Sequence, residues 1–466
     1  MPKPLIFVPG LPASTLIDTD QTRTIFIEPG ALIGSDKAHT LSRLCGPEDP
    51  LLADGVVTGG PIRSKLRFLF IDLKEAETLY ELLAGMGYDV FDDAHVKPLG
   101  WDWRLPVYHP TVQNNLEHAI RTMYQRQGER VVILCHSTGG LVTRWCLESL
   151  AARDPATLDL VDQVIAVGVP WAGTLKPVRC IGIGESIGAG IISAAECRRL
   201  LGHSHAAYDL MPLGPQENEF VPTLFSDRDG NHASPLVRTE WLPQELHSRA
   251  ARSHAALGTR TSHLQLGGRE LRVTNIVGYG KRTDTGAQIT APGSRWPIRM
   301  TTSDDGDGTV PRESAAWLSG AGVRTFHVPY GCYSSGPESG KHSQLWRAPP
   351  ARSLLEHVLL DTSGTPYTWA ALDPDDAYDK RRFVRIRVMG LDPQGRPLEN
   401  ARASVARIRS RRKGKDYPLD SWGRATVVFD RAREAPDYNR YNVPVDLTWT
   451  HQGTEFTERL PISFLA

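Results

Sequence analysis

Short apolar runs alternate with longer amphipathic stretches over roughly the first 360 residues. The apolar runs at 5–8, 130–135 and 163–169 are typical of strands that are buried on both faces of a sheet. Apolar positions spaced three and four apart predict helices over 72–84 and 111–126. A strand, a sharp turn, a helix and a further strand form the crossover unit of a parallel sheet. The pattern therefore predicts an α/β fold in which helices cover the sheet.

Between 171 and 266 this alternation loosens into a segment rich in Gly, Ser and His. We expect a cap insertion here that covers the functional edge of the sheet, because such segments carry specificity. Its apolar stretch 180–197 has two interpretations, a glycine-hinged lid over an acyl pocket or a buried helix on the sheet. Regular strands return at 271–280 and 323–330, so we expect the catalytic domain to span 1–370.

The last part of the chain follows a different pattern. An acidic linker is expected at 371–380. From 381 to 466, apolar and polar residues alternate with period two between turn dipeptides, which is typical of antiparallel strands. We expect an all-β accessory domain here, a sandwich of the immunoglobulin-like or prealbumin-like kind.

The composition argues against several classes of protein. The 466 residues include 53 basic and 53 acidic ones, so the net charge of zero gives no electrostatic reason to expect nucleic-acid binding. Six cysteines without a Cys-x-x-Cys pair indicate reduced thiols rather than a disulfide framework or a cysteine metal site. We accordingly expect no metal and no cofactor.

The amino-terminal residues MPKPLIFVPG lack the long apolar core of a signal peptide. The most apolar stretch, 181–195, is broken by glycines and is shorter than the roughly 20 residues of a membrane span. We expect a soluble cytoplasmic protein, with export by a specialised secretion system as the alternative.

The strongest chemical signal is the segment LCHSTGGL at 134–141. A serine between a strand and a helix needs small residues two positions away on either side, because the backbone bends sharply there. Gly139 meets this requirement, whereas Cys135 takes the place of the usual glycine. We interpret Ser137 as a nucleophile, and the alternative is a glycine-rich turn with an incidental serine.

A nucleophilic serine needs an imidazole to take its proton and a carboxylate to orient that imidazole. On a sheet of this kind the chain order is Ser, then Asp or Glu, then His. The segment SDDGDGTVP offers Asp307, and the later segment SGKHSQLW offers His342. The acidic segment is a poor calcium loop, because Ser303 would be its first ligand and Glu313 falls one residue short of its last.

Acyl transfer also needs N–H donors aimed at the oxyanion of the tetrahedral intermediate. Thr138, the residue after the serine, offers one of these donors. Leu11 offers the second, since Gly10 in IFVPGLPAS lets the chain turn sharply after an early strand. The alternative for this segment is a plain turn that ends the strand.

As a set, these segments resemble the lecithin:cholesterol acyltransferase family, which also includes lysosomal phospholipase-type transacylases and phospholipid:diacylglycerol acyltransferases. The matching segments follow the family's order over roughly residues 4–360: IFVPGLPAS, IFIEPG, GWDWRLP, LCHSTGGL, VGVPWAGTLK, AAYDLMPL, IVGYGKRT, GDGTVP and KHSQLW. The resemblance implies an α/β-hydrolase fold with a cap insertion. It also implies that Ser137 is the nucleophile, Asp307 the acid and His342 the base, with Leu11 and Thr138 as oxyanion donors.

The resemblance further assigns substrate contact to Phe26 and Trp171, and a supporting role to Asp102 and Arg104. Phe26 stands where the family usually has a tryptophan. Asp102 and Arg104 also have a simpler interpretation, a buried ion pair that ties loops together. Family members that act on lipoproteins close their lid with a disulfide, and here the corresponding region holds only Cys45.

A basic segment lies in the accessory domain. One interpretation is a solvated hairpin loop, and the other is contact with phospholipid headgroups at a membrane surface, at roughly 1 kcal/mol per basic residue. Nucleic acid is not expected as a partner, because no recognition motif accompanies the segment. Its six residues are Arg407, Arg409, Arg411, Arg412, Lys413 and Lys415.

We therefore expect a serine lipid esterase, specifically a phospholipase A-type acyl hydrolase that acts on a lipid or another long-chain ester through an acyl-serine intermediate. Transfer of the acyl group to an alcohol uses the same intermediate, so a lipid acyltransferase is the first alternative. A peptidase or amidase and a non-catalytic binding protein are further alternatives.

Overall fold

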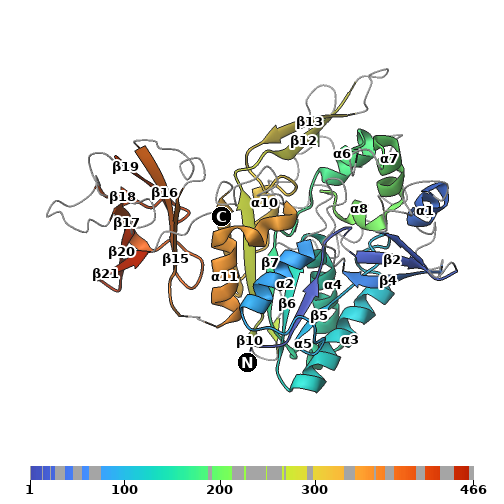
Figure 1. Ribbon diagram of the computed structural model, residues 1–466, viewed down its shortest axis with the longest axis horizontal. Coiled ribbons are helices and arrows are strands. Elements are labelled where there is room, and N and C mark those ends of the chain that lie inside the picture. The colour runs from blue at the N-terminus through green and yellow to red at the C-terminus, as the bar shows by residue number, and fades with distance from the viewer. Residues whose placement is uncertain are drawn as a thin grey trace. The chain divides into compact units, whose positions relative to one another are not determined.

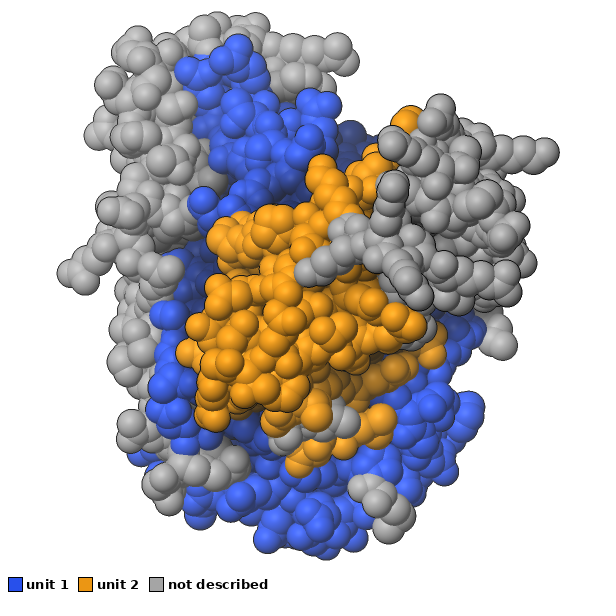
Figure 2. Space-filling view, turned by 90° about the vertical axis from the view of Figure 1, so that its left-hand side faces the viewer, with its two compact units in different colours: residues 1–323 blue, residues 324–466 orange. Residues whose placement is uncertain are grey.

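The computed structural model divides the chain into two compact units, residues 1–323 and 324–466, which Figure 2 draws in different colours. Each unit has its own buried core. The structure describes residues 2–12, 14–20, 23–26, 37–45, 55–61, 75–186, 192–212, 225–226, 248, 265–266, 269–290, 298–329, 342–361, 364–372, 383–405, 415–430 and 445–460.

A parallel sheet forms the centre of the first unit, where its strands follow the order β11-β7-β6-β1-β5 (Figure 1). Every pair of neighbours among these five strands runs parallel. Parallel strands covered on both faces are apolar along their whole length, which explains the unbroken apolar runs. The predicted α/β fold is confirmed. The strands are β1 (Leu5–Val8), β5 (Val96–Pro98), β6 (Val131–His136), β7 (Val161–Val167) and β11 (Arg272–Tyr279).

The two amphipathic helices expected from their spacing are present as α2 (Glu75–Gly85) and α3 (Pro110–Gln127). Helix α3 begins at Pro110. Proline has no backbone N–H, but the N–H groups in the first turn of a helix have no partner within the helix, so no hydrogen bond is lost. The helix ends before Gly128, whose φ of 67° stops it. Helix α4 (Thr138–Arg153) and the short α5 (Pro155–Leu158) follow strand β6 and lead into β7.

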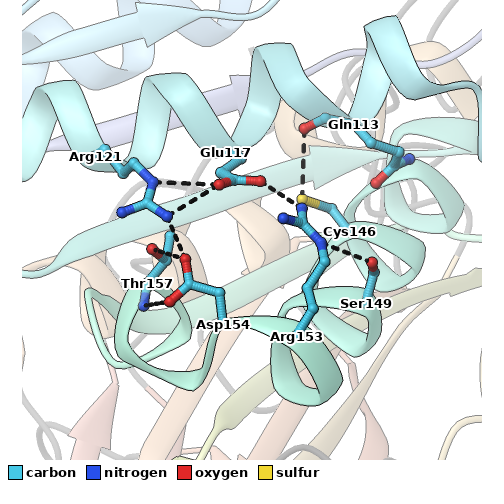
Figure 3. Close-up of polar contacts among 8 residues, drawn as sticks. All are labelled: Gln113, Glu117, Arg121, Cys146, Ser149, Arg153, Asp154 and Thr157. Atoms are coloured by element: carbon cyan, nitrogen blue, oxygen red, sulfur yellow. Dashed lines mark hydrogen bonds and ion pairs between the residues drawn. The ribbon is translucent and has the colours of Figure 1, made fainter.

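Charged side chains join α3 to α4 and α5 (Figure 3). Glu117 of α3 accepts hydrogen bonds from Arg121, at 3.0 Å, and from Arg153 of α4. Asp154 accepts from Arg121 and, at 2.8 Å, from the Thr157 hydroxyl of α5. Partly exposed ion pairs contribute only about 0–1 kcal/mol each, so this cluster aligns the helices more than it stabilises the fold.

Shorter elements fill the connections of the first unit. An antiparallel sheet with the order β3-β2-β4 follows β1, and a second small sheet with the order β13-β12-β8 lies after β11. Their members are β2 (Ser14–Asp18), β3 (Arg23–Phe26), β4 (Val56–Pro61), β8 (Phe225–Ser226), β12 (Thr283–Ile289) and β13 (Ile298–Ser303); the remaining elements are α1 (Lys37–Leu44), β9 (Gln265–Leu266), β10 (Arg269–Glu270) and α10 (Arg312–Ala315).

The described part of the expected cap insertion contains the helices α6 (Lys176–Gly182), α7 (Ala194–His203) and α8 (His205–Asp209). Helix α6 ends at Gly182, and Gly184 follows with a φ of 87°. The stretch 180–197 is therefore not one continuous helix, while its residues 187–191 lie outside the described part. None of the helices in the described ranges is long and apolar enough to cross a membrane.

Two antiparallel sheets with the orders β15-β16-β19 and β18-β17-β20-β21 make up most of the second unit. Residues from both sheets, such as Ile386 and Leu447, share one buried core, which is the organisation of a sandwich. The predicted all-β accessory domain is thus present. The elements are β14 (Val323–Pro329), η3 (His342–Arg347), α11 (Pro349–Leu359), β15 (Tyr367–Leu372), β16 (Phe383–Leu391), β17 (Glu399–Val405), β18 (Tyr417–Pro418), β19 (Arg424–Asp430), β20 (Val445–His451) and β21 (Thr454–Leu460).

The sandwich includes a strand that lies before its expected start at residue 381. Strand β15 pairs antiparallel with β16, with Trp369 opposite Met389, so the expected boundary at 370 falls inside β15. Trp369 and Ala370 are adjacent in sequence and are both buried. This strand therefore lacks the alternation of buried and exposed residues on which the prediction of the sandwich depended.

Candidate active site

Ser137 occupies the turn between β6 and α4, with φ 51° and ψ −127°. A non-glycine residue rarely adopts this conformation, and surrounding contacts must hold it there. The Ser137 N–H donates to the carbonyl oxygen of Val167 on β7, at 3.0 Å, and the Ser137 carbonyl accepts from the N–H of Gly140, at 2.9 Å. The side chain makes no capping hydrogen bond. The hydroxyl is thus not used to cap the helix that follows it.

Two glycines bring α4 close to the sheet. A Cβ on Gly139 would lie 2.6 Å from the carbonyl oxygen of Pro9 and closer still to that of Val8. A Cβ on Gly140 would collide with the side chain of Val169. The requirement for small residues after the serine is therefore steric. Cys135, on the other side, is fully buried in β6, where its thiol fits between the strand and its neighbours.

The loop after β1 lies against the serine. A Cβ on Gly10 would lie 2.8 Å from the Cβ of Ser137, so a side chain at this position would displace the serine. Leu11 follows directly and is half-buried. Thr138 is fully buried in the first turn of α4, where backbone N–H groups have no partner within the helix. The structure thus brings together the segments that carry both expected oxyanion donors.

The segment GWDWRLP supports this loop through backbone contacts. The indole N–H of Trp101 donates to the carbonyl oxygen of Pro9 at 2.9 Å, and the indole N–H of Trp103 donates to that of Ser14 at 3.3 Å. Trp103 also meets Phe26 edge to face, with ring centroids 5.0 Å apart. Phe26 is buried against this tryptophan, and its expected substrate contact stays a prediction.

Asp102 and Arg104 form a buried ion pair within the same segment. Nε of Arg104 lies 2.9 Å from Oδ1 of Asp102, and Nη2 lies 2.6 Å from Oδ2. Nη1 donates to the carbonyl oxygen of Arg43 at 2.8 Å, and the Arg104 carbonyl accepts from the N–H of His205 at 2.9 Å. The pair therefore ties α1 and α8 to the segment, as the simpler interpretation requires.

Asp307 lies in a tight turn that follows β13 and passes beside the end of β11. Its Oδ1 accepts hydrogen bonds from the N–H groups of Thr309, at 3.0 Å, and Val310, at 2.8 Å, and the residue is almost fully buried. An isolated bridge joins Asp307 to Lys281, two residues past the end of β11. Because the carboxyl ends of parallel strands share one edge of a sheet, Asp307, beside the end of β11, lies at the same edge as Ser137, which follows β6.

Trp171 follows β7 at this edge. Its indole N–H donates to Oδ1 of the buried Asn275 at 3.2 Å, and Nδ2 of Asn275 donates to the carbonyl oxygen of Ala315 at 2.7 Å. The Ser314 hydroxyl donates to the carbonyl oxygen of Gly173 at 2.6 Å. The loop after β7 is therefore fixed to the segment after Asp307. Substrate contact by Trp171 stays a prediction.

The remaining expected base, His342, belongs to the second unit. It is the first residue of η3, and its side chain is 9% exposed. Of the six basic residues of the segment 407–415, only Lys415 lies in the described part, where its ammonium group is 5.1 Å from the centre of the Tyr417 ring.

A calcium site at the acidic turn finds no support in its contacts. Asp305 binds Arg312 through both carboxylate oxygens, with Oδ2 2.9 Å from Nη2. The described ranges contain no group of three or more His, Cys, Asp or Glu side chains that could hold a metal ion.

The sequence interpretation missed the buried carboxyl group of Asp209. Burial raises the pKa of Asp209 to about 7, and the N–H of Val107, which donates to its Oδ2 at 2.8 Å, lowers this pKa in part. The next residue, Leu210, accepts a hydrogen bond from the N–H of Thr174 at 2.7 Å. The sequence signal that could have identified Asp209 is an acidic residue inside the apolar segment AAYDLMPL.

The parallel sheet and the strained serine turn define the class of protein, an α/β-hydrolase. Residues 71–287 match the model of the lecithin:cholesterol acyltransferase family. Phosphatidylcholine-sterol acyltransferase of Rattus norvegicus is 29% identical over 154 residues, which cover 31% of this chain and 33% of that protein.

Two further similarities are informative. Lysosomal phospholipase A and acyltransferase of Homo sapiens is 28% identical over 151 residues, which cover 31% of this chain and 35% of that protein. The chain thus spans about a third of the length of these curated relatives. A solved structure of the Tle4–Tli4 complex contains a similar chain, with a TM-score of 0.50 and 14% identity over 78% of this chain and 98% of that one. The structural likeness agrees with the α/β-hydrolase fold.

Proposed function

We propose that this protein is a serine lipid esterase, a phospholipase A-type acyl hydrolase that acts through an acyl-serine intermediate. The observation that carries this proposal is the position of Ser137, in a strained turn with its hydroxyl uncommitted to capping and with Gly10 against its Cβ. Acyl transfer requires a hydroxyl close to backbone N–H donors, and the approach of the Gly10 loop to Ser137 supports this role. The family match and the name of the human lysosomal relative support a lipid as the substrate.

In this proposal His342 removes the proton from Ser137 while the serine oxygen attacks the ester carbonyl. The N–H groups of Leu11 and Thr138 stabilise the oxyanion that forms, and Asp307 stabilises the imidazolium. His342 then gives its proton to the leaving alcohol. A water molecule attacks the acyl-serine by the reverse sequence and releases the fatty acid, which restores the serine hydroxyl.

Transfer of the acyl group to an alcohol is the second candidate, and the names of the curated relatives favour it. Both reactions pass through the same acyl-serine, so only the acceptor differs. Purified enzyme incubated with mixed phospholipids and an added long-chain alcohol distinguishes them by mass spectrometry. A hydrolase releases free fatty acid, whereas an acyltransferase forms a new ester of the added alcohol.

The triad is tested by single substitutions. Ser137→Ala, Asp307→Ala and His342→Ala should each lower kcat by several orders of magnitude, roughly 10⁴-fold or more, with normal folding. Ser149→Ala, a serine on the same helix α4, is the matched control and should keep full activity. A fluorophosphonate probe should label the wild type and the control but not Ser137→Ala. Normal ester hydrolysis by Ser137→Ala excludes the proposal.

We also propose that the basic segment of the accessory domain contacts phospholipid headgroups. The support is the density of charge, six basic residues between 407 and 415. Changing all six to Gln should weaken sedimentation with vesicles that contain anionic lipid and leave hydrolysis of a soluble p-nitrophenyl ester unchanged. Equal sedimentation of both proteins excludes this role.

A further inference from the structure

Three hydroxyl groups from separate segments hold the turn that contains Asp307. The Thr174 hydroxyl donates to the carbonyl oxygen of Thr309, and the Ser314 hydroxyl links the same turn region to the loop after β7. Thr283, the first residue of β12, makes the third set of contacts. All three threonine and serine side chains are buried, so water does not replace these hydrogen bonds easily.

Thr283 contacts the turn on both sides of Asp307. Its Oγ1 accepts a hydrogen bond from the N–H of Gly308 at 2.9 Å and donates to the carbonyl oxygen of Lys281 at 2.7 Å. A Cβ on Gly306 would lie 2.5 Å from the same oxygen. The residues directly before and after Asp307 are therefore both in contact with one hydroxyl group.

This contact matters because the carboxylate of Asp307 takes its orientation from the turn itself. Oδ1 accepts from the N–H groups of Thr309 and Val310, so a change in the backbone at Gly308 would rotate the carboxylate. The φ of Gly308 is 95°, a conformation that glycine adopts without strain. Because glycine can adopt many other conformations as well, a contact must fix this one. The hydrogen bond that the Gly308 N–H donates to Oγ1 of Thr283 supplies that contact.

We propose that Thr283 is a positioning residue for Asp307, an inference that rests on the function proposed above. Without this hydroxyl, the carboxylate no longer has a single orientation toward the base. Loss of the hydroxyl should therefore lower the rate of the chemical step.

The test is a series of substitutions at this residue in the full chain, with a soluble p-nitrophenyl ester as substrate. Thr283→Val, which keeps the volume and removes the hydroxyl, should lower kcat by about 10- to 100-fold with KM changed less than about twofold. Thr283→Ser, which keeps the hydroxyl, should restore most of kcat.

The matched control is Thr157→Val. Thr157 is also buried and hydrogen-bonded, through Asp154, but it lies on α5 away from the turn. This variant should keep the wild-type kcat. If Thr283→Val does not fold, Thr283→Cys, whose thiol is a weak hydrogen-bonding group, takes its place with the same expected direction.

A wild-type kcat for Thr283→Val would overturn the inference. So would an equal loss in Thr283→Ser, which would show that packing rather than the hydroxyl matters. Both results leave the proposed function intact as long as Ser137→Ala is inactive. An active Ser137→Ala variant would instead remove the proposed function itself, whatever the result at Thr283.

Discussion

The indole N–H of Trp101 donates a hydrogen bond of 2.9 Å to the carbonyl oxygen of Pro9. Ninety-two residues separate the two in sequence, and both side chain and acceptor are buried. Pro9 immediately precedes Gly10, the residue whose missing side chain leaves room for Ser137. The tryptophan of GWDWRLP thus fixes the backbone from which the expected oxyanion donor of Leu11 comes.

Trp101→Phe should lower kcat by about 10- to 100-fold, because small displacements of an oxyanion donor are costly. KM should change little, since the donor acts mainly on the transition state. Steady-state kinetics with a soluble ester measures both values. Trp145→Phe, a half-buried tryptophan on α4 that meets Tyr108, is the control and should keep wild-type kcat. An active Trp101→Phe enzyme would show that the loop holds its shape without this bond.

Gly139→Ala should destabilise the protein by several kcal/mol, because its Cβ has no space beside the carbonyl oxygens of Val8 and Pro9. Gly85→Ala is the control, since nothing lies within 4 Å of a Cβ on this exposed residue at the end of α2. Alanine there should be neutral or stabilising by up to about 1 kcal/mol. Urea denaturation followed by fluorescence compares the two variants, and similar midpoints would contradict the steric explanation.

Removal of one member of the Asp102–Arg104 pair should be costly, because it leaves the other charge buried without its partner. Arg104→Met should lower the free energy of unfolding by about 3–5 kcal/mol. Arg153→Met breaks the partly exposed pair with Glu117 and should cost no more than about 1 kcal/mol. Denaturant titration of the two variants measures the difference. Equal losses would mean that burial of the ion pair has no energetic consequence.

The buried carboxyl of Asp209 should make stability fall as pH rises. Its pKa in the folded protein is raised to about 7 from the usual value of 3.8. The stability that the neutral carboxyl of Asp209 contributes is therefore fully present below about pH 4 and is lost as pH rises through about 7. Asp209→Asn keeps an oxygen acceptor for Val107 and carries no charge. Relative to the wild type, this variant should gain stability as pH rises from about 4 to about 7 in urea titrations, and a constant difference would contradict the assignment.

The strands of the central sheet could be predicted from sequence because burial on both faces gives each of them an unbroken apolar run. Strand β6, expected at 130–135, was located in this way to within one residue. The serine turn could be identified because its steric demands fall on neighbours in the sequence, Gly139 above all.

Contacts between segments that are far apart in the chain produce no comparable pattern in the sequence. The bond from Trp101 to Pro9 depends on which loops meet at the edge of the sheet, and no periodicity encodes that meeting. The same holds for Thr283, which lies 24 residues before Asp307 and is ordinary as a strand residue. Asp209 was visible as an acidic residue among apolar ones, but only its burial shows that its carboxyl group is perturbed.

Strand β15 has a practical consequence for anyone who isolates the accessory sandwich. It supplies hydrogen bonds along β16 from Leu391 to Ile386. A fragment that begins at residue 381 would leave this flank of β16 uncovered, and an open strand flank of that length invites self-association. A fragment that begins a few residues before Tyr367 keeps the flank covered and should stay monomeric at concentrations where the shorter one precipitates.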